Sequence, residues 1–287
     1  MREADEIREV AQTTPRALTK AVILAAGRGT RMREERADVV LEPEQSIMAD
    51  LGLKTMIPFA GRPFLDYVLS ALADAGYEQA CLVVNPQDEV IRDHYTRATS
   101  PTRISVTFAI QQMSRGTADA VLSAENFAAA DSFLMINGDN YYPASSLVAL
   151  RTLGEPGLIG FDRELLQKGS NITMDRLTKY AIGFVRSDGS LERIIEKPEP
   201  EIAAASAGST VISMNCWRFS SNIFAACRAI SPSARQELEL ADAVQYAIDT
   251  LHARFRVVRS DAAVLDLTNR TDIVNVGARL HGLHVAP

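Results

Sequence analysis

Short apolar runs alternate with segments of helical periodicity along the first half of the chain. The runs predicted to be strands cover residues 21–25, 79–84, 105–110 and 132–136. The helical segments between them cover residues 63–75, 87–95 and 117–127. Strands that alternate with helices are typical of βαβ units, so this pattern predicts a largely parallel sheet with helices on both faces.

The second half of the chain predicts a more mixed set of elements. The expected strands cover residues 180–186, 191–196, 210–219 and 255–258, and the expected helices cover residues 221–229, 241–251 and 270–280. Asp188-Gly189 predicts a hairpin between the first two of these strands. The two halves together predict an α/β fold with one mixed, mostly parallel sheet, and no linker divides the chain into independent domains. Residues 1–19 are expected to be an N-terminal extension, and residues 20–287 a single domain.

Charge and composition exclude several classes of function. The 30 lysines and arginines are outnumbered by 36 aspartates and glutamates, and this net charge of -6 argues against binding nucleic acid. No apolar run approaches about 18 residues, and the N-terminus resembles no signal peptide, so no membrane segment is expected. Cys81, Cys216 and Cys227 are widely spaced and form no zinc motif. We expect buried free thiols in a cytoplasmic protein.

A glycine-rich turn follows the first predicted strand. Ligands of parallel sheets bind beyond the carboxyl ends of the strands, and residues 27–31 lie at such an end. Gly27 and Gly29 would let backbone N–H groups approach a phosphate, and neighbouring arginines add positive charge. Met32 occupies the third glycine position of the dinucleotide-binding fingerprint, which argues against a nicotinamide dehydrogenase. On spacing alone, a tight turn without a ligand stays an alternative.

An aspartate follows the fourth predicted strand at the same edge of the sheet. Asp139 lies between Gly138 and Asn140. A carboxylate at such a strand end offers the hard oxygen ligands that Mg²⁺ prefers. The Gly-Asp-Asn sequence is also favourable turn chemistry, so a turn-forming role is the alternative for Asp139.

Six motifs in order resemble the sugar-1-phosphate nucleotidyltransferase family, the nucleotide-sugar pyrophosphorylases. They occupy residues 21–32, 54–63, 111–120, 137–140, 196–198 and 264–269. Each motif is short, and their common order makes the resemblance specific over roughly residues 20–280. The resemblance implies the family's Rossmann-like fold and a Mg²⁺-dependent reaction between a nucleoside triphosphate and a sugar-1-phosphate.

In the family reaction, a phosphate oxygen of the sugar-1-phosphate attacks the α-phosphorus of the triphosphate in line, and pyrophosphate leaves. The attacking phosphate is largely dianionic near pH 7, because its second pKa is about 6, so no general base is required. Catalysis then depends on positioning and on charge neutralisation.

The resemblance also assigns roles to residues of this chain. The expected catalytic residues are Arg31 for the leaving phosphates, Lys54 for charge at the α-phosphate, and Lys197 for the sugar phosphate. Asp139 and Asp266 are expected to hold Mg²⁺. The expected nucleotide-binding residues are Ala25, Ala26, Gly27, Gly29, Thr30, Gln111, Gly116 and Thr117. The expected substrate-binding residues are Asn140, Tyr180, Glu196 and Asn215. Taken singly, Lys54 and Lys197 are more readily interpreted as plain surface lysines, and Asp266 has the alternative of a turn or helix-cap residue.

Departures from the family pattern bear on the acceptor. Residues 33–53 form an insertion in which residues 41–51 predict a helix, interpreted as a local lid or packing element. Ala181 and Asn215 stand where the family commonly has glycine, and both positions lie beside the sugar in the family. A larger side chain at either position would contact the acceptor or narrow its pocket, so the identity of the acceptor stays open.

The sequence thus predicts nucleotidyl transfer to a hexose-1-phosphate. UTP or dTTP is favoured because Gln111 can pair with the imide edge of uracil or thymine. A guanylyl-, adenylyl- or cytidylyltransferase, acting on another sugar phosphate or on a non-sugar phosphate or phosphonate, stays an alternative. A non-catalytic regulatory subunit that binds nucleotide sugars is the rival from another class. No nucleic-acid or membrane partner is expected, and the resemblance favours a homo-oligomer because many family members are oligomers.

Overall fold

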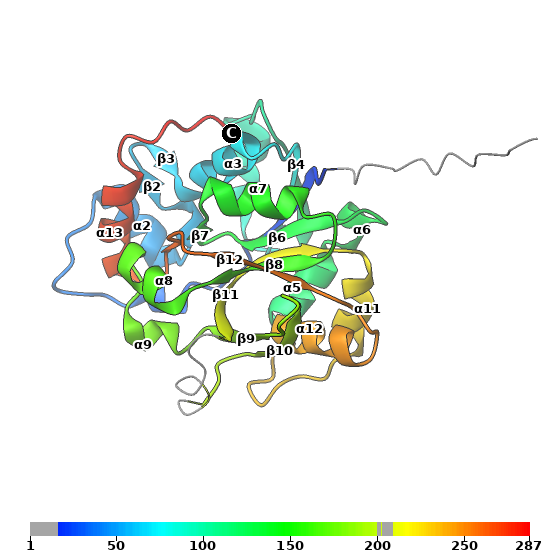
Figure 1. The fold of residues 1–287 in the computed structure, drawn as a ribbon. Coiled ribbons are helices and arrows are strands. Elements are labelled where there is room, and N and C mark those ends of the chain that lie inside the picture. Colours follow the sequence, from blue (N-terminus) through cyan, green and yellow to red (C-terminus); the bar gives the residue numbers. More distant parts are fainter. Residues whose placement is uncertain (1–16, 200–201, 203–208) are drawn as a thin grey trace, which may run out of the picture.

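The computed structural model describes residues 17–199, 202 and 209–287 (Figure 1). The strands are β1 (Lys20–Leu24), β2 (Pro58–Phe59), β3 (Arg62–Pro63), β4 (Gln79–Val84), β5 (Ser105–Ile110), β6 (Phe133–Asn137), β7 (Asn140–Tyr141), β8 (Gly157–Phe161), β9 (Ala181–Val185), β10 (Leu191–Ile195), β11 (Thr210–Phe219), β12 (Arg256–Ser260) and β13 (Leu265–Asp266). The helices are α1 (Thr30–Arg33), α2 (Pro43–Leu51), η1 (Lys54–Met56), α3 (Phe64–Asp74), α4 (Glu89–Asp93), η2 (His94–Ala98), α5 (Thr117–Ser123), α6 (Glu125–Ala128), α7 (Ala144–Thr152), α8 (Arg163–Gly169), α9 (Met174–Leu177), α11 (Asn222–Ala229), α12 (Leu240–Asp249) and α13 (Arg270–Leu280). Most of the predicted N-terminal extension lies outside the described residues.

One large sheet forms the centre of the molecule, in the order β10-β9-β11-β6-β1-β4-β5, with β8 paired to β11 and β12 paired to β8. Strands β6, β1, β4 and β5 pair in parallel, and so do β8 and β12. Strand β11 is antiparallel to β6, β8 and β9, and β10 is antiparallel to β9. Among the nine strands of this sheet, only β10 and β11 therefore run against the rest. The predicted mixed, mostly parallel sheet is confirmed.

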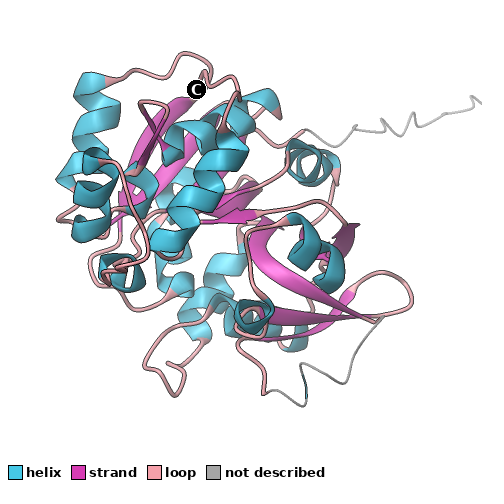
Figure 2. Ribbon diagram, turned by 90° about the vertical axis from the view of Figure 1, so that its left-hand side faces the viewer, coloured by secondary structure: helices cyan, strands magenta, loops and turns pink. Residues whose placement is uncertain are grey.

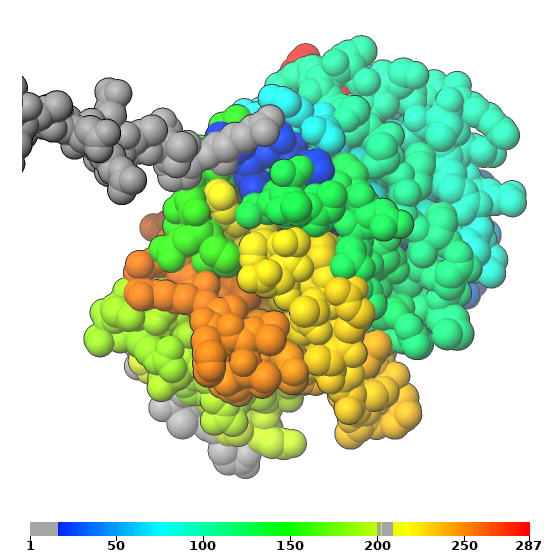
Figure 3. Space-filling view, turned by 90° about the vertical axis from the view of Figure 1, so that its right-hand side faces the viewer, coloured from blue at the N-terminus to red at the C-terminus, as the bar shows by residue number. Residues whose placement is uncertain are grey.

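Alternating side chains of the central strands divide the core into two layers. On β1, Ala21 and Ile23 belong to one layer and Val22 to the other. The first layer is covered by α3, α7 and α13, and the second by α5, α11 and α12. Figure 2 shows helices on both sides of the sheet, and Figure 3 shows α11 and α12 side by side in yellow and orange. None of the helices in the described part of the chain combines the length and the apolar character that a bilayer crossing requires.

Strand β8 was not expected from the sequence, because glycine weakens the strand pattern. Its position between β11 and β12 explains these glycines. A Cβ at Gly157 would lie 2.4 Å from the carbonyl oxygen of Arg256, and one at Gly160 would lie 2.7 Å from the Val211 side chain. Close approach of neighbouring strands therefore selects glycine here. Helices α7, α8 and α9 were also not expected.

Two predicted helices differ in detail from the observed ones. The segment predicted at residues 87–95 is a short α-helix, α4, followed by the π-helical turn η2. The segment predicted at residues 117–127 is divided at Ala124 into α5 and α6. The helix expected inside the insertion is confirmed as α2, and the Arg33 guanidinium on α1 donates to the Leu51 carbonyl at its end (3.0 Å).

Candidate active site

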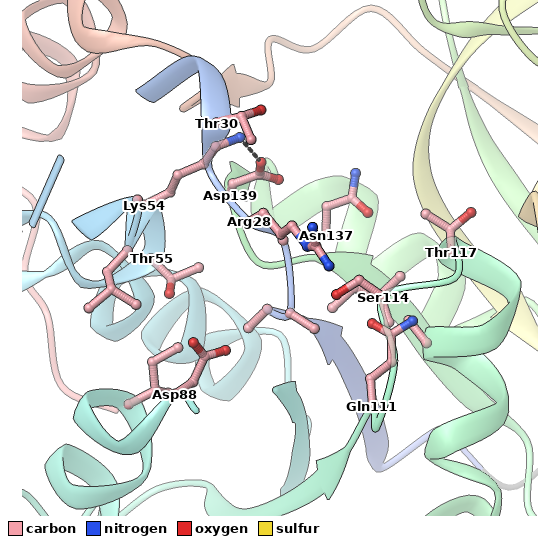
Figure 4. Close-up of a pocket in the computed structure, with 18 of the residues that line it drawn as sticks. Arg28, Thr30, Lys54, Thr55, Asp88, Gln111, Ser114, Thr117, Asn137 and Asp139 are labelled. Carbon is pink, nitrogen blue, oxygen red and sulfur yellow. Dashed lines mark hydrogen bonds and ion pairs between the residues drawn. The ribbon is translucent and has the colours of Figure 1, made fainter. Parts of the chain in front are cut away.

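A cavity of about 560 Å³ opens beyond the carboxyl ends of β1 and β6. Figure 4 shows side chains from several separate segments around it. The predicted site residues that line it are Ala25, Ala26, Gly27, Thr30, Lys54, Gln111, Gly116, Thr117 and Asp139. The fold therefore brings together the glycine-rich turn, the first lysine motif, the 111–117 loop and the aspartate after β6.

The glycine-rich turn is held against the insertion. Gly29 has a φ of 59°, and a Cβ there would lie 2.2 Å from the Gly52 carbonyl oxygen, so backbone packing requires this glycine. A Cβ on Gly27 would meet no described atom within 4 Å, although Gly27 lines the cavity. Packing accounts for Gly29 but not for Gly27, and the space beside Gly27 belongs to the cavity.

Lys54 and Asp139 form an ion pair inside the cavity. The Lys54 Nζ donates to the Asp139 Oδ2 at 2.9 Å, and both residues line the cavity (Figure 4). Lys54 begins η1, and Asp139 immediately follows β6 and Gly138. Neither is a freely solvated surface charge, so the surface interpretation of Lys54 does not hold.

Asp266 reaches the same region through a short antiparallel pair. Strand β13 pairs with β7, which places Asp266 opposite Asn140, and the Leu267 N–H donates to the Asp139 carbonyl at 2.9 Å. Asp266 is only 4% exposed. Burial, followed by the nearby Asp139 carboxylate, raises the pKa of Asp266 above its usual range.

A buried network surrounds the Asp266 carboxylate. The Arg176 Nη2 lies 3.1 Å from Oδ1, the Thr268 hydroxyl donates to Oδ1 at 2.6 Å, and the Tyr180 hydroxyl donates to Oδ2. Arg176 also pairs with Asp272 at 2.7 Å. The hydrogen bond from Tyr180 connects the residue just before β9 to Asp266, the second predicted metal ligand.

The two aspartates fit a divalent cation that takes its other ligands from substrate and water. Among the described residues there is no group of three or more histidine, cysteine, aspartate or glutamate side chains with the arrangement of a metal site. Mg²⁺ commonly uses one or two protein carboxylates and completes its shell with phosphate oxygens and water. Lys54 and Arg176 form ion pairs with the two carboxylates.

Asn140 lies between the two aspartates. It is 2% exposed, and its Oδ1 accepts from the Asn137 Nδ2 at 3.1 Å. Its own Nδ2 is buried without a hydrogen-bond partner among the described residues. A buried donor without a partner costs free energy, although Asn140 is not among the described residues that line the cavity.

Asn215 occupies a bend where the sheet divides. Before it, β11 pairs with β9, and after it, with β6. The φ of Asn215 is 56°, a left-handed conformation that asparagine adopts more readily than most residues other than glycine. This explains why asparagine can replace the glycine common in the family. Trp217, just beyond it, is 1% exposed and stacks on Phe219, so it packs in the core.

Glu196 and Lys197 follow β10, outside the lining of the main cavity. Lys197 is exposed and has a φ of 43°, which is uncommon for a residue with a side chain. Burial raises the pKa of Glu196 to about 7, and the neighbouring Glu239 contributes in the same direction. Glu196 therefore titrates near neutral pH.

Glu196 predicts a specific pH dependence of stability. Its folded pKa of about 7 lies above its ordinary value of 4.5, so the stability it contributes is present below pH 4.5 and lost as the pH rises through 7. Urea denaturation between pH 4.5 and 8 should show the stability of Glu196→Gln increasing relative to the wild type over this window. Glu192→Gln, an exposed change on β10 just before Glu196, is the control, and its stability difference from the wild type should stay constant with pH. If the stability difference between Glu196→Gln and the wild type did not change with pH, the raised pKa of Glu196 would be refuted.

Arg31, predicted to bind the leaving phosphates, is exposed on α1. It does not belong to the described residues that line the cavity, whereas its neighbour Arg28 does.

The sequence did not predict Asn85, Asp88 and Ser114 as site residues. Asn85 donates to the Ala26 carbonyl at 2.7 Å, and it accepts from the Ser114 hydroxyl at 3.1 Å. Its position after β4, at the same edge as the other strand ends, is the signal that could have found it.

Comparisons with known proteins agree with this geometry. A family model described as nucleotidyl transferase matches residues 48–281. The UTP–glucose-1-phosphate uridylyltransferase AglF of Haloferax volcanii is 29% identical over 80% of this chain and 83% of its own length. A glucose-1-phosphate thymidylyltransferase of Streptomyces griseus is 27% identical over 80% of this chain and 57% of its own length.

The chain spans only 47% to 59% of the length of seven further curated relatives that it matches, the thymidylyltransferase among them. A crystal structure of UDP-glucose pyrophosphorylase with UDP-glucose superposes with a TM-score of 0.70 at 16% identity. It covers 92% of this chain and 98% of that one. At this identity the superposition supports the fold alone.

Proposed function

The chain belongs to the nucleotidyl transferase family as a sugar-1-phosphate nucleotidyltransferase, and we propose that it converts UTP or dTTP and a hexose-1-phosphate into an NDP-sugar and pyrophosphate. The cavity carries this proposal, because sequence motifs between residues 25 and 139 converge on one space beyond β1 and β6. Its volume of about 560 Å³ is within the range of small-molecule sites. The relatives named for UTP and for glucose-1-phosphate thymidylyl transfer support the same substrate class.

In this proposal, Asp139 and Asp266 hold a Mg²⁺ ion. When bound, such an ion would supply positive charge that neutralises the reacting phosphates. Lys54, which lines the cavity beside Asp139, would neutralise charge at the α-phosphate. The orphaned Nδ2 of Asn140, adjacent to Asp139, would donate to a substrate oxygen.

The remaining cations surround the phosphates in the same proposal. Arg31 would bind the leaving phosphates from α1, with Arg28 from the lining of the cavity beside it. Lys197 would bind the sugar phosphate, and its left-handed backbone is the kind of local strain that clusters at functional sites. Glu196 would accept hydrogen bonds from sugar hydroxyls.

Pyrophosphate release tests this function. Purified protein with Mg²⁺ is mixed with UTP, dTTP, CTP, ATP or GTP, each with a panel of hexose-1-phosphates. We expect turnover with UTP or dTTP and at least one hexose-1-phosphate. If the protein turned over only CTP with a non-sugar phosphate or phosphonate, the proposed substrates would be wrong and the cytidylyltransferase alternative would hold. Nucleotide-sugar binding without any turnover would instead favour a regulatory subunit.

A further inference from the structure

The side-chain amide of Gln111 is held in one orientation by hydrogen bonds within the protein. Its Nε2 donates to the Gly116 carbonyl at 3.1 Å and to the Asp119 Oδ2 at 2.9 Å. Gln111 is 3% exposed and lines the cavity beside Thr117 (Figure 4). Both hydrogen-bond partners are acceptors, so the nitrogen of the amide must face them.

Asp119 is itself positioned by hydrogen bonds from Arg115. It lies in the first turn of α5 and is 7% exposed. Its Oδ1 accepts from Arg115 Nε at 3.1 Å and Nη2 at 2.6 Å, which leaves Oδ2 for Gln111. Gly116, with a φ of 115°, permits this arrangement, because a Cβ there would lie 2.5 Å from the Leu238 carbonyl.

Gln111 can therefore offer a ligand only a hydrogen-bond acceptor. An amide nitrogen carries two hydrogens, and both are engaged by Gly116 and Asp119. The carbonyl oxygen Oε1 is the remaining polar atom that can meet a base. Uracil and thymine carry a hydrogen on N3, whereas N3 of cytosine carries a lone pair, so an acceptor facing N3 binds the first two and repels the third.

We propose that Asp119 is a positioning residue that locks Gln111 as an acceptor and thereby favours UTP and dTTP over CTP. This inference rests on the proposed function, in which the base lies against the 111–117 loop with its N3 edge toward Gln111. It assigns a specificity role to a carboxylate that touches the glutamine and not the nucleotide.

Calorimetric binding of UTP and of CTP, each with Mg²⁺, tests the inference without requiring turnover. The wild type should bind UTP more tightly than CTP. Asp119→Asn should lower the ratio of the two affinities at least about tenfold, because the asparagine can donate to Oε1 and allow the amide to turn over. Asp249→Asn is the matched control, since Asp249 holds the Gln245 amide on α12 outside the cavity, and its ratio should be unchanged.

A double-mutant cycle separates positioning from a general loss of structure. Gln111→Met should lower the same ratio, and adding Asp119→Asn to it should change the ratio no further, because Asp119 acts through Gln111. Additive effects would overturn the inference. If Asp119→Asn does not fold, NMR of the wild type decides: the Gln111 side-chain amide protons should stay protected from solvent exchange, and free exchange would overturn the inference.

The outcomes also distinguish this inference from the proposed function. A preference for UTP that is lost in Asp119→Asn, without pyrophosphate release from any sugar phosphate, would support the inference and refute the function. Pyrophosphate release with an unchanged base preference in folded Asp119→Asn would do the reverse. A wild type that binds CTP more tightly than UTP would overturn the inference directly.

Discussion

Asp139→Asn is expected to lower kcat about a thousandfold while the protein stays folded. Asparagine keeps an oxygen that can accept from Lys54, and the Asp139 carbonyl that accepts from Leu267 belongs to the backbone, so local packing is preserved. The substitution removes the negative charge that the proposed metal requires. Steady-state pyrophosphate release measures kcat, and titration with Mn²⁺ followed by electron paramagnetic resonance should show weakened metal binding.

Lys20 and Asp131 provide a matched control for this prediction. They form another lysine–aspartate pair, at 2.7 Å, outside the cavity lining. Asp131→Asn should leave both kcat and Mn²⁺ binding unchanged. Full activity in Asp139→Asn would refute the metal assignment of Asp139, and lost activity with unchanged Mn²⁺ binding would restrict its role to orienting Lys54.

Sequence periodicity predicted the strands and helices whose apolar patterns are long. The bounds of β4, β5, β11 and α13 agree with the predicted residues because burial on one or both faces imposes a clear pattern there. Strand β8 lacked this pattern because its glycines are selected by neighbouring backbone rather than by a hydrophobic face. Local sequence does not report such an approach between distant strands.

The sequence predicted only those site residues that lie next to elements with a clear apolar pattern. Gln111, Lys54 and Asp139 belong to motifs next to well-patterned elements, and the structure brings them to one cavity. The position of Asp266 depends on β13 and β7, which have two residues each and no periodicity. The bend at Asn215 and the partnership of Arg176 with Asp266 are tertiary features that no spacing in the sequence signals.

Arg176→Met is expected to reduce the free energy of unfolding by about 3–5 kcal/mol, the usual cost of removing one partner from a buried ion pair. The Arg176 side chain is 12% exposed, and its partners Asp266 and Asp272 are 5% and 3% exposed. Asp272 keeps the N–H donors of Thr268 and Asn269. Most of the loss therefore falls on Asp266, which would face the Asp139 carboxylate without a cationic neighbour. Urea denaturation followed by circular dichroism measures the change.

The pair of Arg97 and Asp93 tests whether burial is the cause. These side chains are 78% and 54% exposed at a separation of 3.2 Å, so Arg97→Met should change stability by no more than about 0.5 kcal/mol. Mg²⁺ should raise the Tm of Arg176→Met more than that of the wild type, because a cation bound between the two aspartates would relieve their repulsion. Equal losses in the two variants would show that Arg176 contributes no more than a surface charge. An equal response to Mg²⁺ would place the metal away from Asp266.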